Sequence, residues 1–214
     1  MDKTIIDDAL RFVRNIFQDD YSGHDYFHTW RVYKTAEKIA EQENADLMIV
    51  QLAALLHDVD DIKLSPETYA NKDRAVDFLR KHGISDAMIK TVCHIIGEVS
   101  FKGTDSVVPE TIEGKCVQDA DRLDAMGAVG IARAFAYGGN HNRVLYDPAI
   151  KPAVNMNADE YRNHVSTTIN HFYEKLFQLK GMMNTDTARK IAGQREDFMK
   201  IYLSQFLAEW DGIR

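Results

Sequence analysis

The spacing of apolar residues along the chain is helical almost throughout. Apolar side chains recur at every third or fourth position, and no stretch alternates with the two-residue period of a half-buried strand. We therefore expect an all-α protein. The predicted helices cover about residues 4–17, a stretch around 32–40, and then about 47–57, 66–80, 86–96, 109–126, 157–176 and 186–207.

Several residues mark where these helices begin. Ser65 followed by Pro66 predicts an N-cap and the first position of a helix. Asn157 with Glu160 three residues later approaches a capping box, which opens the helix predicted to continue to residue 176. Residues 138–156 contain Gly, Asn and two prolines without any period, so we expect an ordered loop or a flexible lid there.

The composition excludes several classes of protein. The 214 residues include 26 Lys and Arg against 33 Asp and Glu, and no basic cluster occurs, so nucleic acid is not an expected partner. Two cysteines, Cys93 and Cys116, are too few for a disulfide framework. The N-terminus lacks the continuous apolar stretch of a signal peptide, and the apolar run Leu47–Leu56 is too short to span a membrane. We expect a cytoplasmic protein without a membrane partner.

One pair of residues carries candidate metal chemistry. His57 and Asp58 end the apolar helix 47–57, where uncompensated polar groups would cost roughly several kcal/mol. A lone pair of this kind is more often a helix cap, but His28 opens another helix and Asp121 lies within a third. Two histidines and two carboxylates form a mixed nitrogen and oxygen site that suits Mn, Fe, Co, Ni or Zn, and Mg less well.

These four residues resemble the H…HD…D signature of the HD-domain superfamily of metal-dependent phosphohydrolases. The likeness extends to HxxRV at 28–32, AALLHDVDD at 53–61, QDADRLDAMGAVGIARAFAYGG at 118–139 and NHFYEKL at 170–176, as in the small stand-alone bacterial members. It implies one HD domain over residues 1–214, with a metal-site core at about 20–130 and C-terminal helices at about 157–210 packing on it. It also implies that one divalent ion is held by His28, His57, Asp58 and Asp121.

The resemblance also suggests which residues act around the ion. Several members place an acid three residues beyond the HD aspartate, where it handles protons, and Asp61 occupies that position here. Family nucleotidases usually have Glu there, so Asp60 is a competing candidate, and both acids can also be solvated groups at a helix end. His94 is a single additional histidine where dinuclear members supply two, which favours a mononuclear site.

A phosphate substrate needs cationic and polar partners near the ion, and the planar guanidinium of Arg suits it best. Arg122 is the preferred candidate, with pairing to a neighbouring aspartate as the alternative. The complete set of substrate-binding candidates is Arg31, Arg122, Lys63, His24, His94 and Lys102.

A polar stripe accompanies the helix predicted over 157–176. His164, Thr168, His171 and Lys175 recur at helical spacing beside its apolar face. Such a stripe either lines a pocket or packs as a hydrogen-bonded flank, and the sequence leaves both interpretations open.

The function indicated is hydrolysis of a phosphate ester of a nucleotide or another small phosphorylated metabolite by metal-activated water. One alternative is a regulatory module that binds metal and nucleotide without turnover. A second is an alarmone hydrolase acting on a guanosine pyrophosphate, and the weakest is a two-iron oxygenase, which needs more histidine ligands. The protein is expected to be a monomer or a homodimer.

Overall fold

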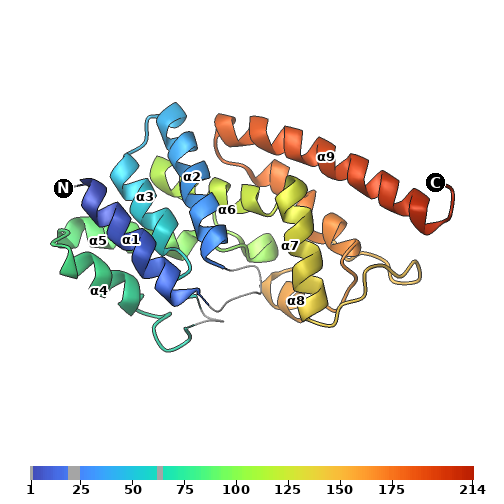
Figure 1. Ribbon diagram of the computed structural model, residues 1–214, viewed down its shortest axis with the longest axis horizontal. Coiled ribbons are helices and arrows are strands. Elements are labelled where there is room, and N and C mark those ends of the chain that lie inside the picture. The colour runs from blue at the N-terminus through green and yellow to red at the C-terminus, as the bar shows by residue number, and fades with distance from the viewer. Residues whose placement is uncertain (1, 19–24, 62–64) are drawn as a thin grey trace. The chain divides into compact units, whose positions relative to one another are not determined.

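The computed structural model describes residues 2–18, 25–61 and 65–214, and the regular structure in these ranges is helical, with no strand among them (Figure 1). The all-α prediction is therefore confirmed. The chain divides into two compact units: unit 1 comprises Met1–Ser100 and Val107–Asp121, and unit 2 comprises Phe101–Ser106 and Arg122–Arg214. The single-domain organisation stays a prediction. None of the helices in the described ranges has the length and apolar character needed to cross a membrane.

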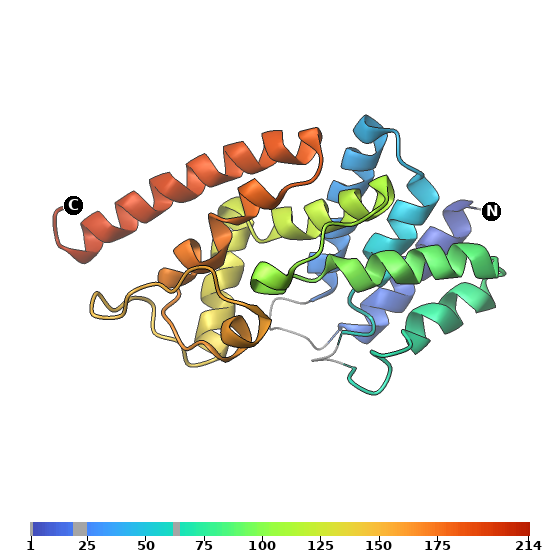
Figure 2. The same cartoon turned by 180° about the vertical axis from the view of Figure 1, so that it is seen from behind.

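Unit 1 is built around α3. Its helices are α1 (Asp2–Ile16), α2 (Tyr26–Glu43), α3 (Leu47–Leu56), α4 (Asp73–Lys81), α5 (Asp86–Val99) and most of α6 (Ile112–Asp124). The short helix α3 packs against α1, α2 and α5, and every residue in 52–56 is buried (Figures 1 and 2). A helix that is apolar nearly all round needs apolar neighbours on several sides, which is why it occupies the core.

Side-chain caps set the starts of three helices in unit 1. The carboxylate of Asp46 accepts hydrogen bonds from the backbone N–H groups of Met48 and Ile49, and Ser85 caps α5. Asp25 caps α2 by accepting from the backbone N–H of His28 at 2.7 Å. Each cap satisfies an N–H group that has no partner within its own helix.

The helix predicted to begin at Pro66 begins instead at Asp73, so that prediction is wrong in its first turns. Residues 66–72 form turns, and the Ser65 hydroxyl is buried without a hydrogen-bond partner in the described chain. The carboxylate of Asp60 accepts from the backbone N–H groups of Arg74 and Ala75. The cap of α4 therefore comes from a residue distant in sequence, which no local pattern reveals.

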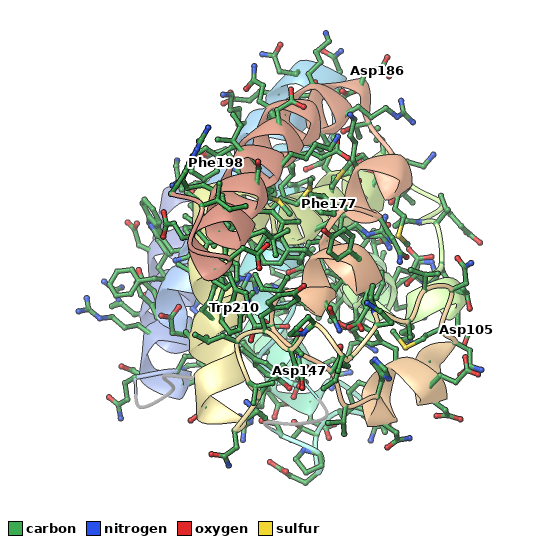
Figure 3. The ribbon with its side chains drawn as sticks, turned by 90° about the vertical axis from the view of Figure 1, so that its right-hand side faces the viewer. Asp105, Asp147, Phe177, Asp186, Phe198 and Trp210 are labelled. Carbon is green, nitrogen blue, oxygen red and sulfur yellow. The ribbon has the colours of Figure 1, made fainter. Side chains whose placement is uncertain are left out.

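Unit 2 combines the long helices α7 and α9 with the short helix α8 and irregular segments. Its elements are the short 3₁₀ helix η1 (Gly103–Asp105), α7 (Gly127–Asn140), α8 (Ala158–Asn163), the π-helix η2 (Phe172–Leu176), the 3₁₀ helix η3 (Leu179–Met182) and α9 (Asp186–Trp210). Helix α9 packs against α7 and η3. Figure 3 shows α9 running from Asp186 past Phe198 to Trp210, with Asp147 in the loop that follows α7. The helix predicted to run to 126 ends at Asp124, and α7 is a separate element.

The continuous helix predicted over 157–176 is wrong. The capping box of Asn157 and Glu160 is present, but α8 ends at Asn163 and the backbone of His164 is extended. Val165, which the pattern placed on the apolar face, is 89% exposed. Residues 168 and 169 form a turn, and helical structure resumes at Asn170.

The buried carboxylate of Glu174 explains this break. Its Oε1 accepts from Ser166 Oγ at 2.7 Å and from the backbone N–H of Ala153 at 3.2 Å, and His164 Nε2 lies 3.1 Å away. Hydrogen bonds from an extended segment satisfy the buried charge, and a continuous helix would not place the same donors there.

Candidate metal centre

Three buried side chains of unit 1 converge. One ligand atom from each of His28, His57 and Asp58 lies within 4.8 Å of the other two. Asp58 Oδ2 lies 3.4 Å from His28 Nε2 and 3.2 Å from His57 Nε2. Ligands of one ion with bonds of about 2.0–2.2 Å lie about 3–3.5 Å apart, so these separations suit a shared cation.

Asp121 completes the cluster from α6. Its Oδ1 lies 3.5 Å from His28 Nε2 and 4.0 Å from His57 Nε2. Its side chain is 24% exposed, against 10% for Asp58. The four residues predicted as ligands are therefore brought together within unit 1, and the more exposed Asp121 leaves one side of the cluster open to solvent.

The local fold aims both imidazoles at this point. His28 lies in the first turn of α2, which the Asp25 cap holds in place. His57 directly follows α3, and its Nδ1–H donates to the backbone carbonyl of Ala54 at 2.8 Å. That hydrogen bond selects the tautomer in which Nε2 carries a lone pair, as second-shell partners do for metal-bound histidines.

The Nε2 atom of His57 provides the clearest test of whether a cation fits. It is buried and, within the described residues, has no hydrogen-bond partner, although Asp58 Oδ2 is close. A buried polar atom without a partner is costly, so such an atom needs an explanation. A lone pair pointing toward two carboxylates is what a divalent cation requires, and the residues therefore fit one.

The electrostatics of the cluster agree with this interpretation. Burial by itself lowers the pKa of His57, but the neighbouring carboxylates of Asp58 and Asp121 and the Ala54 carbonyl raise this pKa to about 9. The cluster thus attracts positive charge strongly. A proton and a metal ion compete for the same atom, so metal binding releases protons.

The two acids predicted to handle protons differ in their surroundings. Asp60 is buried and its carboxylate is engaged in capping α4, which does not favour a role in proton transfer. Asp61 is partly exposed, and its backbone N–H donates to the Asp58 carbonyl at 3.1 Å. Both roles stay predictions, and Asp61 is the better placed of the two.

The predicted substrate-binding residues are more dispersed. Arg31 follows His28 by about one turn of α2. The Arg122 guanidinium donates a hydrogen bond to the backbone carbonyl of Met182, a structural contact that the sequence did not predict. His94 is exposed and lies 3.5 Å from Glu98, outside the cluster.

Three candidates remain. Lys102 is exposed at the start of η1, and His24 and Lys63 lie outside the described residues. The sequence analysis did not identify the two groups that orient the histidines, the Asp25 carboxylate and the Ala54 carbonyl. Asp25 could have been identified, because an Asp three residues before a histidine at the start of a helix has the spacing of an N-cap. The Ala54 carbonyl could not, because a backbone group has no residue type that marks it in a sequence.

An all-α unit in which an adjacent His-Asp pair meets a second histidine and a second aspartate defines a class of helical metal-binding domains. The sequence profile of the HD domain matches residues 25–126. The chain is 42% identical over 204 residues to the uncharacterized protein YpgQ of Bacillus subtilis. The alignment covers 94% of this chain and 92% of YpgQ. The protein therefore belongs to the HD-domain family.

Solved structures with similar sequences share the fold over the whole chain. A Lactobacillus plantarum protein is 38% identical with a TM-score of 0.88, and 99% of each chain is covered. An HD-superfamily hydrolase from Bacillus thuringiensis is 40% identical with a TM-score of 0.77 and the same coverage. YpgQ in complex with ADP is 39% identical with a TM-score of 0.78, covering 98% of this chain and 100% of that one. The chain thus has the fold of the HD-superfamily hydrolases.

Proposed function

We propose that the protein is a metal-dependent phosphohydrolase that cleaves a phosphate ester of a nucleotide or another small phosphorylated metabolite. The observation that carries the proposal is the convergence of His28, His57, Asp58 and Asp121, with the buried Nε2 of His57 lacking a hydrogen-bond partner in the described chain. The similarity to an HD-superfamily hydrolase over nearly the whole chain supports a hydrolytic reaction.

The four residues would hold one divalent ion, of Mn, Fe, Co, Ni, Zn or Mg. When bound, such an ion polarises a phosphoryl oxygen and lowers the pKa of water. The chain's own residues prepare the site. The Ala54 carbonyl fixes the tautomer of His57, and the surrounding apolar residues of α3 exclude water from the inner side. Asp61 is the residue we assign to proton transfer, because Asp60 is engaged elsewhere.

A nucleotide is the preferred substrate. YpgQ, which is similar to this chain over its full length, has been solved in complex with ADP. A nucleoside di- or triphosphate also offers oxygens suited to a divalent cation.

The test is phosphate release from a panel of nucleotides and sugar phosphates after metal is stripped and Mn, Co, Ni or Mg is added back. Asp58→Ala is assayed beside the wild type, with Asp77→Ala, an exposed acid on α4, as the matched control. We expect metal-dependent turnover that Asp58→Ala abolishes and Asp77→Ala retains.

Metal binding without turnover of any ester would overturn the hydrolase proposal and favour a regulatory binding module. Turnover that needs no metal, or that survives in Asp58→Ala, would contradict the assignment of the site. Localisation in the cytoplasm and the choice between monomer and homodimer stay predictions.

A further inference from the structure

Helix α9 of unit 2 is packed on one side and open on the other. Its 25 residues lie against α7 and η3, and the residues that it buries lie on one side of the helix. Four of them are Ala188, Ala192, Met199 and Leu203. The helix therefore contributes one side to the interior of unit 2.

The opposite side of α9 exposes apolar side chains. Phe198, which lies near the middle of the helix, is 46% exposed, and Ile201 is 68% exposed (Figure 3). Single exposed apolar residues are ordinary, but these two belong to a longer pattern. Alternating steps of three and four residues connect them to other positions on the same side, which together we call the outer face: Ile191, Gln194, Phe198, Ile201, Gln205 and Ala208.

The pattern of the outer face is typical of a helix that packs along its length against another helix. Alternating steps of three and four residues are the repeat of such pairs. Every residue of the outer face is at least partly exposed, so no helix of the described chain covers it. A partner helix must therefore come from another molecule.

The outer face is complementary to itself when two copies of α9 lie antiparallel. If Phe198 opposes Ile201 of the second copy, a two-fold axis makes Ile201 oppose Phe198 of the second copy. Residues whose numbers have the same sum then also oppose each other. These further pairs are Gln194 with Gln205 and Ile191 with Ala208. Apolar side chains thus meet apolar ones, and amides meet amides that can hydrogen-bond to them.

Charged residues near the ends of α9 favour the antiparallel direction. Lys190 and Glu209 are exposed, and their numbers have the same sum as the pairs above. Gln205 Nε2 donates to Glu209 Oε1 at 2.7 Å, so this carboxylate lies beside the outer face. An antiparallel pair brings Lys190 to Glu209 of the second copy at both ends, whereas a parallel pair would bring like charges together. Opposed helix dipoles add to this preference.

We propose that the outer face of α9 binds a second copy of this chain and forms a two-fold symmetric homodimer with antiparallel α9 helices. The contact from Ile191 to Ala208 would be about 26 Å long at a rise of about 1.5 Å per residue. One pair of helices buries less surface than an obligate interface, so we expect an equilibrium between monomer and dimer at about micromolar concentrations. The proposal concerns residues of unit 2 alone and does not depend on the metal centre or on the proposed hydrolysis.

The first test is sedimentation equilibrium of the intact protein over a series of concentrations. Ile201→Lys should raise the Kd of the dimer at least about a hundredfold, because the substitution acts twice across a two-fold interface and each is worth about tenfold. The new lysine follows Asp197 by one turn, which favours the helix of the monomer. Val165→Lys is the matched control. Val165 is 89% exposed in unit 2 but outside α9, so the Kd should not change.

A charge reversal tests the register. Lys190→Glu should raise the Kd about tenfold, because two like-charge contacts replace two attractive ones. Adding Glu209→Lys to Lys190→Glu exchanges the two charges and should restore the Kd of the wild type. A variant that only damages the helix would show no such recovery.

Cross-linking tests the direction of the helices. A short thiol-to-thiol cross-linker should join two chains of the double variant Gln194→Cys and Gln205→Cys, because these positions oppose each other in the antiparallel pair. Gln194→Cys alone should not be joined. The wild type, in which Cys93 is partly exposed and Cys116 is buried, provides the blank.

Three results would overturn the proposal. One is a wild type that sediments as a monomer at every concentration, which would mean that another kind of partner covers the outer face. Another is a dimer whose Kd neither Ile201→Lys nor Lys190→Glu changes, which would place the interface elsewhere. The third is cross-linking of Gln194→Cys alone, which would show parallel helices.

Discussion

Two histidines, one in each unit, show how neighbours decide the chemistry of the same side chain. Burial lowers the pKa of both. In unit 1 the carboxylates of Asp58 and Asp121 outweigh burial and raise the pKa of His57 to about 9, whereas in unit 2 two cations act with burial and lower that of His171 to about 3. The surroundings of His57 thus favour a positive charge on its ring, and those of His171 disfavour one.

The units also differ in how their backbones are held. Apolar side chains dominate the interior of unit 1, and its helices are regular. In unit 2 a run of buried polar residues, Ser166, Thr167, Thr168 and Asn170, lies where the backbone changes from extended to helical and then to a π-helix. Polar groups need specific partners, and the backbone adopts whatever course supplies them.

The largest expected effect concerns the cation site. Asp121→Asn keeps the shape of the ligand but removes its charge, and the affinity for Mn should fall at least about a hundredfold, since even outer-shell partners of metal ligands are worth about 10–100-fold. Calorimetry on metal-stripped protein measures this, with Asp77→Asn as the control. An unchanged affinity would remove Asp121 from the ligand set.

The next largest effect concerns the core of unit 1. Leu55→Ala creates a cavity in α3, where the side chain is fully buried, and should lower the free energy of unfolding by about 3 kcal/mol. Chemical denaturation measures the loss, and hydrogen exchange should show it across α1, α2 and α5. A loss below about 1 kcal/mol would mean that the neighbours of α3 close the cavity.

The third prediction concerns the buried carboxylate of Glu174, which is part of the polar interior of unit 2. Glu174→Ala leaves the Ser166 hydroxyl and the Ala153 N–H without their acceptor, at a cost of about 2 kcal/mol. Hydrogen exchange should localise the loss to residues 153–176. Glu174→Gln, which keeps one acceptor oxygen, is the matched variant and should cost less. Equal losses for both variants would show that the carboxylate charge, rather than its hydrogen bonds, holds the segment.

The smallest expected effect is a pH dependence of the free energy of unfolding that comes from His171. Because the folded protein holds His171 neutral down to about pH 3, the unfolded state binds the extra proton first, below its pKa of about 6.5. The stability contributed by neutral His171 is complete above that value and is lost as the pH falls. Between pH 7.5 and 5.5 the loss is about 1 kcal/mol. His171→Gln should remove this pH-dependent part of the stability. The check is the free energy of unfolding of both proteins measured by chemical denaturation at several pH values. The same pH dependence in both would contradict the lowered pKa of His171.

The sequence predicted unit 1 more successfully than unit 2. The caps Asp46 and Ser85 and the burial of α3 followed from local patterns, because an apolar helix with a capping residue needs little else to define it. The start of α4 did not, since its cap is Asp60, fourteen positions before Arg74. In unit 2 the period of Tyr161, Val165 and Ile169 predicted a helix, yet Val165 is exposed because buried Glu174 draws the preceding segment into an extended course.

By itself, the sequence determined the helical class, the family resemblance and the residues that could hold a cation, because these depend on residue type and on spacing along the chain. Only the tertiary structure decided that Asp121 reaches the two histidines, that the Ala54 carbonyl orients His57, and that Arg143 lies beside Thr168. Those contacts join residues distant in sequence or involve backbone groups. Their energies depend on burial and on the charges around them, which exist only once the chain has folded.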